Sequence, residues 1–212
     1  DHMRYLDHIM CTAAALVKAV RERARASTHV KKTKDNKEGL FHSLHIRRGD
    51  FQYKKTRVEP SKILEITTQH VGLEEGATVF ISTDERNKSF FDPLKEHYDI
   101  LFLDDFGAEL GDINTNYYGM LDQLVASKGD AFVGTWWSTF TGYINRMRGY
   151  YIAKHALDGH EDGTMKSWYI VPEDRVDEMR EYRAVRLPIY MREFPTAWRD
   201  IDKGIDQLAV IE

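Results

Sequence analysis

The stretch LHIRRGDF (residues 44–51) joins an apolar run directly to a histidine, two adjacent arginines, a glycine and an aspartate. An apolar run that stops at glycine and charged residues predicts a buried strand with cationic side chains at its end. Because successive residues of a strand face opposite ways, His45 and Arg47 are expected on one face, and Ile46 and Arg48 on the other. The face that carries His45 and Arg47 is therefore a candidate anion site.

The same kind of strand recurs between residues 39 and 151, each time followed by a segment with helical spacing. Strands that alternate with helices through short connections are typical of a parallel sheet covered on both faces. We therefore predict an α/β fold with a Rossmann-like parallel sheet. The predicted strands are residues 40–46, 77–83, 99–103 and 130–134, and the predicted helices are residues 60–71, 86–98 (interrupted at Pro93), 115–129 and 138–151.

The sequence on either side of this region has a different character. Residues 1–38 comprise an amphipathic helix, predicted from Tyr5 to Ala26, and a polar, lysine-rich loop. Residues 152–212 are rich in charged and aromatic side chains and contain helix-breaking prolines. We expect them to form a tail of helical and extended pieces that packs on the same domain.

Composition excludes several kinds of protein. The chain has 30 basic and 34 acidic residues, so its net charge of −4 gives no general attraction for nucleic acid. Cys11 is the single cysteine, which excludes an intrachain disulfide and a cysteine-based metal site. No apolar run reaches the roughly 18 residues of a membrane span, so none is predicted in this chain.

Polar segments follow three of the predicted strands: HIRRGDF, STDE (residues 82–85) and GTWWSTF (residues 134–140). In open α/β sheets, ligands bind beyond the carboxyl ends of the strands, so these segments are expected to meet at one site. The third segment opens a helix at Ser138 and Thr139, and the unpaired amides of a helix start attract anions. Taken alone, Ser138 would favour an ordinary helix cap.

The two arginines are interpreted differently. A guanidinium at a strand end can bind a phosphate through two parallel hydrogen bonds, or it can pair with a nearby carboxylate such as that of Asp50. We assign carboxylate pairing to Arg48 and phosphate binding to Arg47. Asp122 lies in a predicted helix beside apolar residues. Its carboxylate could lie on the surface or accept paired N–H donors from a purine such as guanine.

Together these residues resemble the GDP-fucose-dependent protein O-fucosyltransferases and, more loosely, the wider GDP-fucose transferase superfamily with its α1,6-fucosyltransferases. The resemblance is carried by three segments, which are LHIRRGDF, VFISTDE (residues 79–85) and LDQLVASKGDAFVGTWWSTFTGYINRMRG (residues 121–149). The third segment has its charged, glycine and hydroxyl residues in register with the donor-binding block of the family: Asp122, Asp130, Gly134, Ser138, Thr139 and Phe140.

The resemblance implies a GT-B glycosyltransferase in which residues 39–151 form the C-terminal, donor-binding region. Arg47 would be the catalytic contact to the β-phosphate of GDP, with His45 beside it on the donor. Ser138, Thr139 and Phe140 would hold the phosphates and fucose, and Asp122 would receive the guanine. The implied activity is transfer of fucose from GDP-fucose to a hydroxyl of a protein or glycan, with inversion. No metal or other cofactor is required, and the implied compartment is the lumen of the ER or Golgi.

The sequence departs from this family in one large respect. The 43 residues before Leu44 are too few for the N-terminal Rossmann domain of a GT-B enzyme, so another domain or a partner chain would have to supply it. The alternative function is a non-catalytic or incomplete GDP-binding domain.

Other functions fit the sequence less well. An adhesion protein that uses Arg48-Gly49-Asp50 would need a flexible loop, and a kinase of the P-loop type would need a Gly-rich loop with Lys-Ser/Thr, which is missing. Asp104 and Asp105 invite a metal site, but solvation in a loop is the favoured interpretation.

Overall fold

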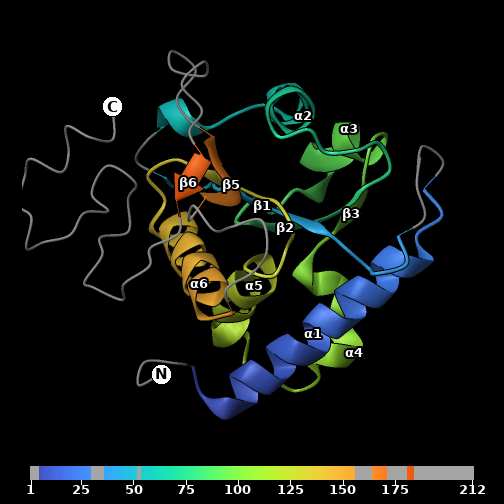
Figure 1. Ribbon diagram of the computed structural model, residues 1–212, viewed down its shortest axis with the longest axis vertical. Coiled ribbons are helices and arrows are strands. Elements are labelled where there is room, and N and C mark those ends of the chain that lie inside the picture. The colour runs from blue at the N-terminus through green and yellow to red at the C-terminus, as the bar shows by residue number, and fades with distance from the viewer. Residues whose placement is uncertain (1–4, 30–35, 52–53, 156–163, 171–180, 184–212) are drawn as a thin grey trace, which may run out of the picture.

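The sheet at the centre of the molecule is six-stranded, with the order β3-β2-β1-β4-β5-β6 (Figure 1). The computed structural model describes residues 5–29, 36–51, 54–155, 164–170 and 181–183. Five strands run parallel, and β6 pairs antiparallel with β5. The predicted Rossmann-like α/β fold is therefore confirmed. The strands are β1 (His42–Ile46), β2 (Thr78–Thr83), β3 (Asp99–Leu101), β4 (Phe132–Thr135), β5 (Thr164–Ile170) and β6 (Glu181–Arg183).

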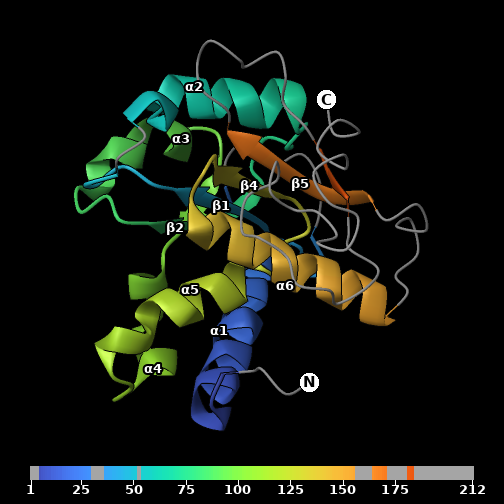
Figure 2. The same cartoon turned by 90° about the vertical axis from the view of Figure 1, so that its left-hand side faces the viewer.

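Helices cover both faces of this sheet (Figures 1 and 2). One face packs against α2 (Pro60–Glu65) and α3 (Asp92–Lys95). The other face packs against α1 (Asp7–Ala26), α4 (Gly107–Leu110) and α5 (Tyr118–Ala126), and α6 (Thr139–His155) lies beside α5. Short 3₁₀ segments connect these elements at Lys54–Thr56, Lys88–Phe91, Leu103–Phe106 and Thr115–Tyr117. Among the described residues, no helix is both long and apolar enough to cross a membrane.

The alternation of side chains along β1 assigns each residue to one of these two layers. Leu44 and Ile46 are fully buried in the cluster that includes α2 and α3, whereas Phe41 is buried with α1 and α5. His45 therefore lies on the same side as α5 and α6. Burial on both faces explains why the central strands are almost continuously apolar.

The strand order places a topological switch point between β1 and β4. From β1 the chain proceeds through β2 to β3 on one side, and it then crosses to β4 and β5 on the other side. The connections leave the carboxyl ends of β1 and β4 in opposite directions, which opens a crevice there. This is the place where three polar segments were predicted to meet.

Most predicted elements are present, with differences in detail. The predicted helix 60–71 is α-helical over Pro60–Glu65 and continues as a π-helix over Ile66–His70. Pro93 lies in the first turn of α3, where a missing N–H costs nothing, so it starts that helix instead of interrupting one.

The region predicted as a tail contributes more to the fold than expected, because it supplies β5 and β6. Helix α6 also continues four residues past the predicted boundary at 151. The remaining predictions for residues 152–212 lie outside the described residues, and the three proposed divisions of the chain stay a prediction.

Candidate functional site

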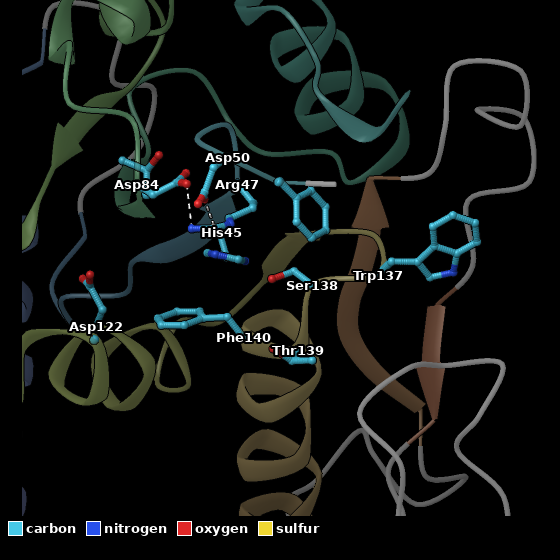
Figure 3. Close-up of a pocket in the computed structure, with 12 residues that line it drawn as sticks. His45, Arg47, Asp50, Asp84, Asp122, Trp137, Ser138, Thr139 and Phe140 are labelled. Atoms are coloured by element: carbon cyan, nitrogen blue, oxygen red, sulfur yellow. Dashed lines mark hydrogen bonds and ion pairs between the residues drawn. The ribbon is translucent and has the colours of Figure 1, made fainter. Parts of the chain in front are cut away.

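A cavity of about 610 Å³ lies at the switch point. All six residues predicted from the sequence to bind the donor line it: His45, Arg47, Asp122, Ser138, Thr139 and Phe140. These side chains come from the end of β1, from α5 and from the start of α6 (Figure 3). The remaining lining residues are Asp50, Phe51, Thr83, Asp84, Gly119 and Trp137. Segments up to 95 positions apart in the sequence thus form one concave surface.

Arg47 is the cationic group of this cavity, and two carboxylates bind it (Figure 3). Its Nη1 lies 2.6 Å from Oδ2 of Asp84, and its Nη2 lies 3.1 Å from Oδ1 of Asp50. The ring of Phe51 lies 5.8 Å from the guanidinium carbon. The carboxylate pairing that was considered for Arg47 is therefore present in the free protein, and its predicted contact with phosphate stays a prediction.

Two threonine hydroxyls fix the backbone at this strand end. Oγ1 of Thr135 accepts the Arg47 N–H at 2.9 Å and donates to the His45 carbonyl at 3.0 Å. On the other side of β1, Oγ1 of Thr83 donates to the Ile46 carbonyl at 2.7 Å. Side chains of the neighbouring strands thus continue the hydrogen bonding of β1 beyond its last backbone pair.

Arg48 points to the opposite face, as strand alternation predicts. Its guanidinium lies 3.8 Å from the centre of the Phe90 ring, donates to the Val58 carbonyl at 2.9 Å, and pairs with Glu85 at 3.3 Å and Glu59 at 3.4 Å. Local carboxylate pairing is thus observed for Arg48. The Arg-Gly-Asp tripeptide is not displayed as an adhesion loop, because its arginine is held against the protein.

His45 is buried at the floor of the cavity. Its ring stacks on Phe140 with 4.5 Å between the ring centres, and its Nδ1 lies 2.6 Å from Oγ1 of Thr141. Burial lowers the pKa of His45 to about 3. The imidazole is therefore neutral at physiological pH, and the positive charge of the cavity belongs to Arg47.

The start of α6 lies next to the carboxyl end of β4. Gly134 allows this proximity, because a Cβ there would lie 2.3 Å from the side chain of Thr141. Between strand and helix, Trp137 has a left-handed backbone with φ of 59°, an uncommon conformation for a bulky residue. This turn leads into α6, and the Ser138 N–H donates to the Thr135 carbonyl at 3.4 Å. The first amides of the helix that follow have no partner inside the helix.

Asp122 lies at the other end of the cavity, on α5 (Figure 3). Its Oδ1 is buried and has no hydrogen-bond partner among the described residues. Burial raises the pKa of this carboxyl to about 7, and a hydrogen bond from Ser82 opposes part of that shift. Of the two interpretations of Asp122, the exposed surface carboxylate is excluded. A buried acceptor without a partner costs free energy unless a ligand completes it.

Sequence reasoning gave Asp84 no role, although it included the segment STDE among the converging strand ends. The position carried a usable signal, because Asp84 directly follows β2, which is the neighbour of β1.

Of the two adjacent aspartates considered for a metal site, Asp105 has a structural partner: its Oδ2 accepts the backbone N–H of Phe102 at 2.7 Å. Within the described part of the chain, no three His, Cys, Asp or Glu side chains gather closely enough to hold a metal ion.

Comparison with known protein families gives a match to part of the chain. A protein-family model described as GDP-fucose protein O-fucosyltransferase matches residues 1–151. No curated protein matches the chain. The matched residues include every residue that lines the cavity.

Proposed function

The chain belongs to the GDP-fucose protein O-fucosyltransferase family, and from this premise we propose that its cavity binds GDP-fucose for transfer of the fucose. The acceptor is a hydroxyl of a protein or glycan, and the configuration at the sugar carbon is inverted. The single observation that carries this proposal is the cavity itself. It combines a guanidinium and a helix start with a carboxyl whose Oδ1 is buried and has no hydrogen-bond partner among the described residues.

The Arg47 end suits the diphosphate. Transfer breaks the bond between the sugar carbon and the diphosphate oxygen, so negative charge grows on the β-phosphate as that bond lengthens. Arg47 can stabilise this charge through charge-assisted hydrogen bonds. The amides at the start of α6 add donors that are already oriented, and the helix dipole favours an anion there. Because these groups supply the positive charge, the proposed chemistry requires no metal or other cofactor.

The Asp122 end suits guanine. Guanine presents a ring N–H and an amino group side by side, and a carboxylate with free oxygens can accept from both. Adenine and the pyrimidines of nucleotides do not present this pair of neighbouring donors. Asp122 is half-buried, and its buried Oδ1 has no hydrogen-bond partner among the described residues, so a base with two donors would remove the cost of that burial.

The floor of the cavity suits the sugar. His45 and Phe140 form a stacked pair between the two ends. The sugar carbon gains positive charge as the diphosphate leaves, and a protonated histidine at this place would repel it. Burial keeps His45 neutral, so its ring can contact fucose without that repulsion.

We assign the chain to the donor-binding half of a GT-B enzyme, with the acceptor and the base that deprotonates it bound outside this cavity. The alternative is a domain that binds GDP without transferring fucose. Calorimetric titration with GDP and UDP tests donor binding, and a radiolabelled transfer assay with GDP-fucose in the complete enzyme, which includes the acceptor-binding half, separates the two. GDP binding without product would favour the alternative, and failure of GDP to bind would overturn both.

A further inference from the structure

The two carboxylates that bind Arg47 are held in very different ways. Both carboxylate oxygens of Asp84 have partners: Oδ1 accepts the Arg48 N–H at 2.7 Å, and Oδ2 accepts the Gly49 N–H at 2.8 Å and contacts Arg47 at 2.6 Å. Its side chain is only 24% exposed. A Cβ on Gly49 would lie 2.3 Å from Oδ2, so the glycine permits this close approach. Asp84 therefore ties the end of β2 to the loop that follows β1.

Asp50 makes one contact with the part of the chain that the structure describes. Its Oδ1 lies 3.1 Å from Nη2 of Arg47, and its side chain is 97% exposed. Exposed ion pairs contribute little to stability, because water solvates both charges nearly as well as they solvate each other. The two carboxylates occupy different nitrogens of the guanidinium, so one can leave without the other.

A diphosphate that reaches Arg47 has to replace one of these carboxylates. Replacing Asp84 would break two short backbone hydrogen bonds and would detach the loop from β2. Replacing Asp50 breaks one solvated contact and exposes Nη2, which can then donate to a phosphate oxygen. The phosphate also carries more negative charge than a carboxylate, so the exchange at Asp50 favours the ligand.

We propose that Asp84 is a positioning residue that stays on Arg47 throughout the reaction, and that Asp50 is a stand-in for the diphosphate and is displaced by it. This inference rests on the proposed function, and in it the charge of Asp50 regulates access of the donor to Arg47. In the structure, the single positive charge of Arg47 contacts two carboxylates. Part of the affinity for the donor is therefore spent on expelling Asp50.

The test is a calorimetric comparison of GDP, inorganic pyrophosphate and guanosine on the full chain and its variants. Asp50→Asn removes the competing charge and is expected to tighten GDP and pyrophosphate by about two- to fivefold, the range of an exposed ion pair. Guanosine has no phosphate, so its affinity should stay unchanged. Asp84→Asn is expected to weaken GDP and pyrophosphate by about tenfold or more and to leave guanosine within about twofold. A merely structural role of Asp84 would weaken all three ligands.

The matched control is Glu59→Gln, which neutralises an exposed carboxylate paired with the neighbouring Arg48. It should leave all three affinities unchanged. Weaker or unchanged GDP binding by Asp50→Asn overturns the stand-in role, and equal losses for guanosine and pyrophosphate in Asp84→Asn overturn the positioning role. If Asp84→Asn does not fold, Asp84→Glu takes its place, and it too should weaken GDP and pyrophosphate more than guanosine. Failure of the unmodified chain to bind GDP would instead overturn the proposed function.

Discussion

The charged groups at the two ends of the cavity differ in whether they already have a partner. At the Arg47 end, the cation is already paired, since Arg47 contacts both Asp84 and Asp50. At the Asp122 end, Oδ1 of the carboxyl is buried and has no partner among the described residues. A ligand must therefore break an ion pair of Arg47 at the first end, whereas at the second end it provides the hydrogen bond that Oδ1 of Asp122 lacks. We infer that charge and salt control the first end, whereas pH and the pattern of N–H donors control the second.

The largest expected effect comes from removing the cation. Arg47→Ala in the complete enzyme should lower fucose transfer by about a hundred- to a thousandfold, the usual cost of one donor to a developing anion. The side chain is one-third exposed, so the fold should persist. Radiolabelled transfer, with circular dichroism as the check on folding, measures this. Near-normal turnover would reject the role of Arg47.

Guanine recognition at the Asp122 end is tested by Asp122→Ala. Loss of a charged acceptor should weaken GDP by about ten- to a hundredfold, because a charge-assisted hydrogen bond contributes about 1.5–3 kcal/mol. UDP, which shares the diphosphate but not the guanine donors, should lose much less. Titration calorimetry with both nucleotides provides the comparison. Equal losses for GDP and UDP would show that Asp122 does not recognise the base.

The pH dependence sharpens the contrast between the two ends. Burial raises the pKa of Asp122 to about 7, so the carboxyl is mostly protonated at pH 6 and mostly ionised at pH 8. Guanine donors bind the ionised form, so GDP affinity should rise by about tenfold over this interval. UDP carries a similar diphosphate and corrects for phosphate titration. The excess rise for GDP should vanish in Asp122→Asn, and an excess that persists there would contradict the assignment.

The smallest effect on ligand binding is expected at Arg48. Its guanidinium faces away from the cavity, so Arg48→Ala should leave the GDP affinity within about twofold. Denaturant unfolding should instead show a loss of about 1–2 kcal/mol, from the contacts with Val58 and Phe90. A large loss of GDP binding in a folded Arg48→Ala protein would remove the distinction between the adjacent arginines.

The sequence predicted the position of the site better than its internal contacts. Strand alternation placed His45 and Arg47 on one face, and the rule for strand ends brought Ser138 to the same cavity. The pairing of Arg47 with Asp84 depends on how two loops 37 positions apart approach each other, which no local pattern contains. The state of Asp122 was equally inaccessible, because it depends on the helix being packed against β2.

The strands of the sheet also differ in how well the sequence predicted them. The four strands between residues 39 and 151 are bounded by glycine and charged residues, which made them recognisable. Strand β5 lies in a segment rich in charged and aromatic residues with prolines nearby, for which helical and extended pieces were predicted without bounds. Its identity comes from pairing with β4, a contact that only the folded sheet provides.

The threonine hydroxyls on either side of β1 have a further consequence for the cost of capturing a donor. Thr135 and Thr83 immobilise the main chain up to the first arginine when the protein folds, long before any nucleotide arrives. The contact with Asp84 restrains the side chain of that arginine as well, so most of the entropic penalty of ordering these groups has already been met. Replacing either hydroxyl by a methyl group should therefore lower the rate at which the donor binds, without changing the preference for one nucleotide over another.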